Sequence, residues 1–171
     1  MKTFIKIGLL TLIALATFTA QAADPLLGEN WTLSLGGSGS TTTTGNSQTA
    51  FGAEIDLGHT GHLLLPLQGG IRQTFSYASV EDGEDSALFG TKAYLDATLL
   101  TYKFVDLFGG ANVGITYGNT KPLWGVAPEA GLRFWLKKDV AVVTRVEYPY
   151  DITNAEWSDT LRYFLGFMLK F

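Results

Sequence analysis

Charged residues recur at alternate positions in several segments of this chain, and they are the first candidates for chemistry. Carboxylates and arginines held close together can form ion pairs, line a charge-selective channel or supply groups for acid–base catalysis. The set comprises Glu54, Asp56, Arg72, Asp96, Glu129, Arg133, Arg145, Glu147 and Arg162. It holds five acids and four arginines, and this near balance favours mutual ion pairing over a pore lined by one sign of charge.

The other polar clusters give weaker indications of a catalytic or metal site. His59 and His62 have the H-x-x-H spacing that can supply two metal ligands, but no third ligand stands beside them. An acidic run could bind calcium, but it lacks the spacing of an EF-hand, so we interpret it as a solvated loop. This run comprises Glu81, Asp82, Glu84 and Asp85. We therefore predict no catalytic residue, no metal and no cofactor.

The segments that carry the charges alternate with a period of two. In residues 161–171 the odd positions are all apolar or aromatic: Leu161, Tyr163, Leu165, Phe167, Leu169 and Phe171. The even positions include Arg162, Gly166 and Lys170. This period predicts a β-strand with one apolar face. A soluble protein would hide such a face beneath a second layer.

Seven earlier segments alternate in the same way, which predicts eight strands in all. They cover residues 29–38, 48–58, 66–77, 91–103, 107–117, 123–136 and 140–148. Each is about as long as the ~9–11 residues that a tilted strand needs to cross a bilayer, and no apolar run after residue 22 is long enough for a transmembrane helix. We therefore predict an all-β fold, an eight-stranded antiparallel up-and-down transmembrane β-barrel with charges inside and apolar residues outside.

Short and long connections alternate between these strands. Residues 59–62, 104–106 and 137–139 are the predicted periplasmic turns, and residues 37–47, 79–89, 118–122 and 149–158 are the predicted outer loops. The aromatic residues then divide between the two ends of the barrel, as expected for rings that suit the headgroup level. The outer set is Phe51, Tyr77, Tyr117, Trp124, Tyr148 and Trp157, and the inner set is Trp31, Phe104, Phe134, Phe167 and Phe171. These girdles disfavour the alternative of a soluble, lipocalin-like barrel with its apolar residues inside.

The interior of an eight-stranded barrel is just wide enough for side chains to fill it. Charges on neighbouring strands at similar heights should therefore pair. The predicted pairs are Glu54–Arg72, Glu129–Arg145 and Glu147–Arg162. We interpret the lumen as a polar plug, with a narrow or gated channel as the alternative.

The first 22 residues have the pattern of a secretory signal peptide. Lys2 and Lys6 accompany a mostly apolar stretch, and Ala20-Gln21-Ala22 has the small-x-small pattern of a cleavage site. Its removal would leave a barrel domain of residues 23–171 with ten basic and sixteen acidic residues, a net charge of −6. This balance argues against a nucleic-acid partner. The absence of cysteine excludes a disulfide framework.

With these features in place, the chain resembles the OmpA/OmpX class of small outer-membrane β-barrels. The resemblance is carried by Leu161–Phe171 and by segments such as Phe108–Gly118. It implies a location in the cell outer membrane and contacts with outer-membrane lipids and lipopolysaccharide. It also implies that the closing strand marks the chain for insertion by the barrel-assembly machinery. The residues of this signal are Tyr163, Leu165, Phe167, Leu169 and Phe171.

The favoured function is that of a non-enzymatic barrel acting in envelope integrity or surface adhesion, with an extracellular ligand for its outer loops. It rests on the balanced charges and on the lack of a catalytic cluster. A narrow or gated small-solute channel is one alternative. A lipid A-modifying enzyme is another, but such enzymes use a Ser/His pair near the outer rim, whereas His59 and His62 fall at the inner side.

Overall fold

The computed structural model describes residues 29–42, 49–78, 86–118 and 122–171. Its eight long strands are β1 (Trp31–Thr42), β2 (Thr49–His62), β3 (Pro66–Ala78), β4 (Ser86–Tyr102), β5 (Val105–Gly118), β6 (Leu123–Lys137), β7 (Val140–Glu147) and β10 (Thr160–Lys170). Between β7 and β10 the chain adds a short hairpin, β8 (Tyr150–Asp151) and β9 (Glu156–Trp157). Within these ranges, no helix is long and apolar enough to cross a membrane. The predicted signal peptide and the acidic run at 81–85 lie outside the described residues.

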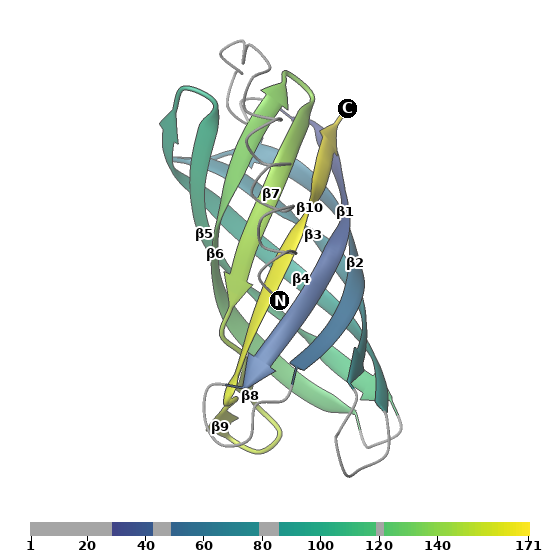
Figure 1. Cartoon of the computed structure of the whole chain (residues 1–171). Coiled ribbons are helices and arrows are strands. Elements are labelled where there is room, and N and C mark those ends of the chain that lie inside the picture. The colour runs from purple at the N-terminus through teal and green to yellow at the C-terminus, as the bar shows by residue number, and fades with distance from the viewer. Residues whose placement is uncertain (1–28, 43–48, 79–85, 119–121) are drawn as a thin grey trace.

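The eight long strands close into an antiparallel barrel (Figure 1). The first seven pair in chain order, and β10 completes the ring by pairing with both β7 and β1. At this seam Trp31 and Phe171 exchange two backbone hydrogen bonds, each 2.9 Å from nitrogen to oxygen. The predicted eight-stranded up-and-down barrel is therefore confirmed, including closure of the last strand against the first near Trp31.

The two faces of the strands differ as their alternation predicts. In β10 and the residue after it, the outward row is exposed and the inward row is buried. The outward row is Tyr163, Leu165, Phe167, Leu169 and Phe171, and the inward row includes Phe164, Met168 and Lys170. Large apolar side chains that all face outward on a closed barrel are suited to lipid rather than to water.

The first predicted turn is wrong in position. Residues 59–62 belong to β2 and pair with residues 66–69 of β3, so the chain reverses at Leu63–Leu65. The glycine and threonine in this stretch indicate a turn locally. The ladder nevertheless continues through them, because pairing with the neighbouring strand outweighs local preference.

Other strand ends also extend beyond their predicted positions. Residues 86–89, predicted in an outer loop, start β4 and pair with residues 75–78 of β3. Val105 and Asp106, predicted in a turn, start β5. Residues 37–42 of the first predicted outer loop (37–47) belong to β1. Residues 150–151 and 156–157 of the last predicted outer loop (149–158) form the β8–β9 hairpin. Strands β1 and β4 therefore reach further at the outer end, and β2 and β5 at the inner end, than the sequence suggests.

Aromatic rings gather at both ends of the barrel. At the outer end, the ring of Phe89 lies 5.1 Å from that of Phe75 and 6.1 Å from that of Tyr117. Tyr148 and Trp157 stack there at 5.2 Å. At the inner end, the rings of Trp31 and His59 meet edge to face at 5.1 Å. All members of the two predicted girdles are exposed except Phe134, which is half-buried.

Candidate functional site

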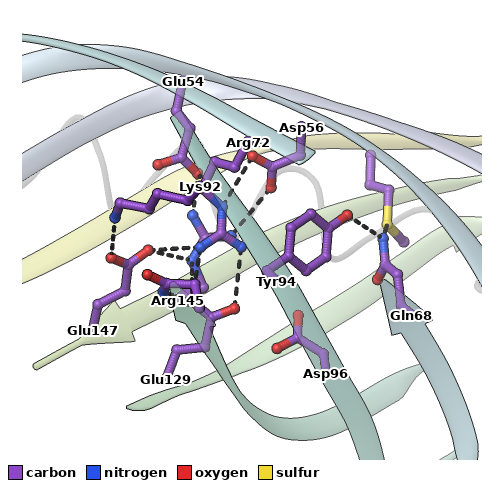
Figure 2. A network of polar contacts seen from close by, with 12 residues as sticks. Glu54, Asp56, Gln68, Arg72, Lys92, Tyr94, Asp96, Glu129, Arg145 and Glu147 are labelled. Atoms are coloured by element: carbon purple, nitrogen blue, oxygen red, sulfur yellow. Dashed lines mark hydrogen bonds and ion pairs between the residues drawn. The ribbon is translucent and has the colours of Figure 1, made fainter. Parts of the chain in front are cut away.

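The centre of the lumen is Arg72 on β3, whose side chain is fully buried. Its Nη1 lies 2.7 Å from Glu129 Oε2 and 2.8 Å from Glu147 Oε1, and its Nη2 lies 3.1 Å from Glu129 Oε1. Its Nε donates to Asp56 Oδ1 at 3.1 Å. The planar guanidinium thus joins carboxylates from three different strands (Figure 2), a role for which five fixed donors are suited.

Arg145 on β7 and Lys92 on β4 complete this cluster. Arg145 donates to Glu54, to Asp56 Oδ2 at 3.2 Å and to Glu147 Oε1 at 3.2 Å. Lys92 Nζ lies 2.6 Å from Glu147 Oε2. All of these side chains are buried. Buried charges are tolerated when they are paired and hydrogen-bonded, and here most of the carboxylate oxygens accept from a cation.

The structure brings together the first two predicted pairs, but at longer distances than the cross-lumen contacts. Arg72 Nε lies 3.5 Å from Glu54 Oε1, and Arg145 Nε lies 3.8 Å from Glu129 Oε2. The shortest bonds of Arg72 instead reach Glu129 and Glu147 across the barrel. Strand adjacency therefore identifies which residues gather, but not which of them bond most closely.

The third predicted pair, Glu147–Arg162, is wrong. The two residues are direct neighbours in the β7–β10 register. However, Arg72 and Arg145 occupy one oxygen of Glu147 and Lys92 occupies the other. Within the described residues, Arg162 has no carboxylate oxygen within 4 Å. Sequence reasoning missed the competitor Lys92, although it shares the inward parity of Asp96 on the same strand.

Asp96 and Arg133 form a looser group beneath the cluster. Arg133 Nη2 lies 3.8 Å from Asp96 Oδ2, and it donates a closer bond, 2.8 Å, to Gln68 Oε1. In the part of the chain that the structure describes, Asp96 Oδ1 is buried without a hydrogen-bond partner. Figure 2 shows Asp96 below Tyr94, with no dashed line joining it to the bonded carboxylates.

Each of the three buried arginines also lies over an aromatic ring. The guanidinium carbon lies 4.6 Å from the ring centroid of Tyr94 for Arg72, 4.0 Å from that of Phe108 for Arg133, and 4.8 Å from that of Phe164 for Arg145. The rings fit because inward glycines leave space for them, at Gly58, Gly131 and Gly166 respectively. A Cβ atom at Gly131, for example, would come within 2.5 Å of the Phe108 ring. These cation–π contacts add to the ion pairs in holding the arginines in place.

The inner end of the lumen holds an apolar and aromatic cluster among its buried polar side chains, which the predicted polar plug did not include. A buried cluster comprises Phe108, Trp135, Ala141, Val143, Phe164 and Met168. Trp135 Nε1 donates to Asp106 Oδ2 at 2.6 Å, and Thr101 donates to the other oxygen at 2.8 Å. Asp106 was missed because it was assigned to a turn. The inward parity of Arg133 could have identified Trp135.

The outer end of the lumen is less completely filled. Two hollows of about 50 and 180 Å³ open there, and both are lined by Lys92 and Arg162. Hydroxyl groups of Ser38, Ser40, Thr74 and Ser76 line the smaller one, and Asn112 and Thr116 contribute to the larger. Since one water occupies about 30 Å³ in the liquid, the larger hollow has room for several waters or for one oxyanion group.

The histidine pair that could supply two metal ligands gains no third ligand within the described residues. The described residues contain no group of three or more side chains that could hold a metal ion. His59 is exposed and packs against Trp31, and His62 is exposed at the end of β2. The acidic residues at 81–85 lie outside the described part of the chain.

Comparison with known proteins gives matches at the level of structure. No protein-family model matches the sequence, and no curated protein does. Neisserial surface protein A superposes with a TM-score of 0.65 at 14% identity, over 84% of this chain and 99% of its own. Ail, the attachment invasion locus protein of Yersinia pestis, was solved in complex with the heparin analogue sucrose octasulfate. It superposes with a TM-score of 0.59 at 16% identity, over 85% of this chain and 100% of its own.

OprG of Pseudomonas aeruginosa gives a TM-score of 0.53 at 14% identity, over 84% of this chain and 96% of its own. This chain, like these three proteins, has the fold of the small outer-membrane β-barrels. The outward apolar rows and the two aromatic girdles agree with that fold, and the resemblance to small eight-stranded barrels seen in the sequence is confirmed. At these identities the likeness concerns the architecture of the barrel and not the residues of its lumen.

Proposed function

We propose that this protein is a non-enzymatic outer-membrane barrel with a sealed lumen, whose outer end binds a ligand at the cell surface. The observation that carries this proposal is the buried cluster around Arg72, which crosses the lumen from β3 to β6 and β7. A solute would have to break several charge-assisted bonds in a water-poor interior to pass. Adhesion or a structural role in the envelope is the function that such a closed barrel supports.

Cell fractionation is the first test of this proposal. The protein should be found in the outer membrane and should migrate differently on a denaturing gel when the sample is left unheated, because a closed barrel resists detergent. Recovery as a soluble periplasmic protein would contradict the location. The outward row of the closing strand, from Tyr163 to Phe171, should be needed for assembly, since it is the proposed signal for the barrel-assembly machinery.

Conductance tests the sealed lumen. Purified protein in a planar bilayer should give no stable current steps, because Arg72, Arg145 and their carboxylates fill the cross-section. Discrete steps that disappear on neutralising these residues would instead support the narrow channel. The enzymatic alternative is tested by comparing lipid A from cells with and without the protein, which should be chemically identical.

Two cations line the outer mouth beside the carboxylates of Glu54, Glu147 and Asp151, and the one that is unpaired among the described residues suggests the class of ligand. Arg162 has no carboxylate within 4 Å among the described residues, and it lines both hollows together with Lys92. Arginine binds oxyanions such as sulfate or phosphate well because it can offer two parallel donors. Ail was crystallised with the heparin analogue sucrose octasulfate. We propose that a sulfated or phosphorylated sugar is the surface ligand here.

Calorimetric titration of the purified barrel with sucrose octasulfate tests this ligand class. Arg162→Gln should weaken binding by about tenfold or more, since hydrogen bonds to charged groups are the strong ones. Lys138→Gln is the matched control, because it removes an exposed cation from the opposite end of the barrel. Equal losses in both variants would mean non-specific attraction and would contradict a site at the outer mouth.

A further inference from the structure

The turn between β2 and β3 exposes three consecutive leucines. Leu63, Leu64 and Leu65 are 76%, 90% and 43% exposed. The turn is well defined, because β2 and β3 remain paired as far as His62 and Pro66 and the amide of Leu63 donates to the carbonyl of Leu65 at 3.3 Å. The three side chains therefore project from a paired hairpin.

The other two turns at this end of the barrel have a different character. The turn between β6 and β7 is formed around Lys138 and Asp139, which are exposed and charged. In the turn between β4 and β5, Lys103 Nζ lies 5.3 Å from the ring centroid of Tyr102, and the rings of Tyr102 and Phe104 are exposed. The charged β6–β7 turn is suited to water, and the β4–β5 turn, with its aromatic rings and lysine, is suited to the membrane–water interface. Three exposed leucines suit neither, because leucine has no polar group to direct towards water.

The leucine turn is continuous with the outward apolar surface of the barrel. On the strand next to it, Leu95, Leu99 and Leu100 are all more than half exposed. A β-bulge between Thr98 and Leu100 interrupts the alternation of β4 at this point, so that two successive leucines both remain on the exposed side. Leu67 of β3 pairs with Ala97 of β4 and links this surface to the turn.

We propose that Leu63–Leu65 form a lipid anchor, inserted among the acyl chains of the inner leaflet of the outer membrane. Burial of apolar surface in hydrocarbon is favourable in proportion to its area, and the turn extends a surface that already faces lipid. The β6–β7 turn remains in water, so the barrel is anchored more deeply on its β2–β4 side. This inference rests on the proposed location in the membrane.

Site-directed spin labelling tests the anchor directly, since the chain contains no cysteine. Leu64→Cys, Lys138→Cys and Phe167→Cys are each labelled with a nitroxide, and the barrel is placed in phospholipid bilayers. Collision rates with oxygen, which concentrates in hydrocarbon, are compared with those of a water-soluble nickel chelate. The oxygen-to-nickel ratio at Leu64 should be several-fold higher than at Lys138 and should approach that at Phe167.

Two results would overturn the anchor. A ratio at Leu64 equal to that at Lys138 would place the turn in water, where it would be free for a soluble partner. Dipolar broadening between Leu64 labels, lost on dilution with unlabelled barrel, would show that a second copy covers the leucines. The Phe167 label separates these results from failure of the proposed location, because a water-accessible Phe167 would contradict a membrane barrel as a whole.

Discussion

At the inner end of the lumen, an apolar and aromatic cluster packs around Trp135, whereas the outer part, from the middle of the lumen outwards, holds the charges around Arg72 and two hollows beside Arg162. The inner end is closed by packed side chains, and its polar groups include Asp106, which accepts hydrogen bonds from Trp135 and Thr101. The outer end is closed by charge, and its outermost cation has no partner among the described residues.

This difference assigns separate tasks to the two ends. The inner end, filled by packed side chains, offers no space to a solute and no free hydrogen-bond donor to a ligand. A region held by charge can retain a donor such as Arg162, because the carboxylate beside it is already occupied. The comparison therefore predicts that changes at the Arg72 cluster and at Trp135 will affect stability, whereas changes beyond Lys92 will affect mainly binding.

The largest effect is expected at Arg72. Arg72→Met keeps an unbranched stem but removes the guanidinium, and so leaves Glu129, Asp56 and Glu147 without their shared cation. Breaking a buried pair by removing one partner costs roughly 3–5 kcal/mol, so the free energy of unfolding in urea should fall by about that amount in phospholipid vesicles. An unchanged midpoint would mean that the outer half is not held by charge.

At the inner end, Trp135→Phe should have the next largest effect. The smaller ring leaves Asp106 Oδ2 without the indole donor that now lies at 2.6 Å. An unsatisfied buried acceptor costs roughly 1–3 kcal/mol, and the unfolding midpoint should shift accordingly. If the double variant with Asp106→Leu recovers the loss, the cost belongs to the stranded carboxylate rather than to the smaller volume of the ring.

Arg162→Gln should have a much smaller effect on stability than Arg72→Met, although both remove an inward arginine. Arg162 is only half-buried and makes no ion pair within 4 Å in the described ranges. A loss below about 1 kcal/mol is expected, as for exposed charges, and the same urea titration measures it. A loss as large as that at Arg72 would show that Arg162 belongs to the structural cluster and would contradict its availability for a ligand.

The sequence predicted the barrel well because period-two alternation is a local property. The inward or outward direction of a residue such as Glu54 or Leu165 follows from its parity alone. Antiparallel closure of β10 on β1 is consistent with the even number of strands. The strand ends were less predictable, since Thr60 and Gly61 resemble a turn until β3 is placed beside them.

The contacts in the lumen could be predicted only in part. Residues of adjacent strands were expected to pair, but the shortest bonds of Arg72 cross the barrel to Glu129, and Arg145 reaches Glu54. Such bonds depend on the diameter of the barrel and on the relative heights of strands far apart in sequence. Competition also matters, because Lys92 binds Glu147, the residue with which Arg162 was expected to pair.

The smallest effect is expected at Asp151, beside the larger hollow on the β8–β9 hairpin. Its slight desolvation would raise the pKa, but bonds from Asn154 and Thr153 outweigh this and lower the pKa of Asp151 below its ordinary value. A lowered pKa means that these bonds hold at neutral pH and are lost as the pH falls through the lowered value. Asp151→Asn should therefore speed amide hydrogen exchange at Thr153 and Asn154 at neutral pH.

Amides of the lumen strands provide the internal control for this exchange experiment. Residues such as Ala141 and Val143, at the inner end, should exchange at the same rate in the variant as in the original protein, because the hairpin pairs with the outer part of β6, at Gly125 and Val126. Faster exchange at both places would couple the hairpin to the packed inner end and would contradict the separation of the two halves. Faster exchange at the hairpin alone would show that the outer mouth can loosen while the barrel beneath it stays closed, as binding at that mouth requires.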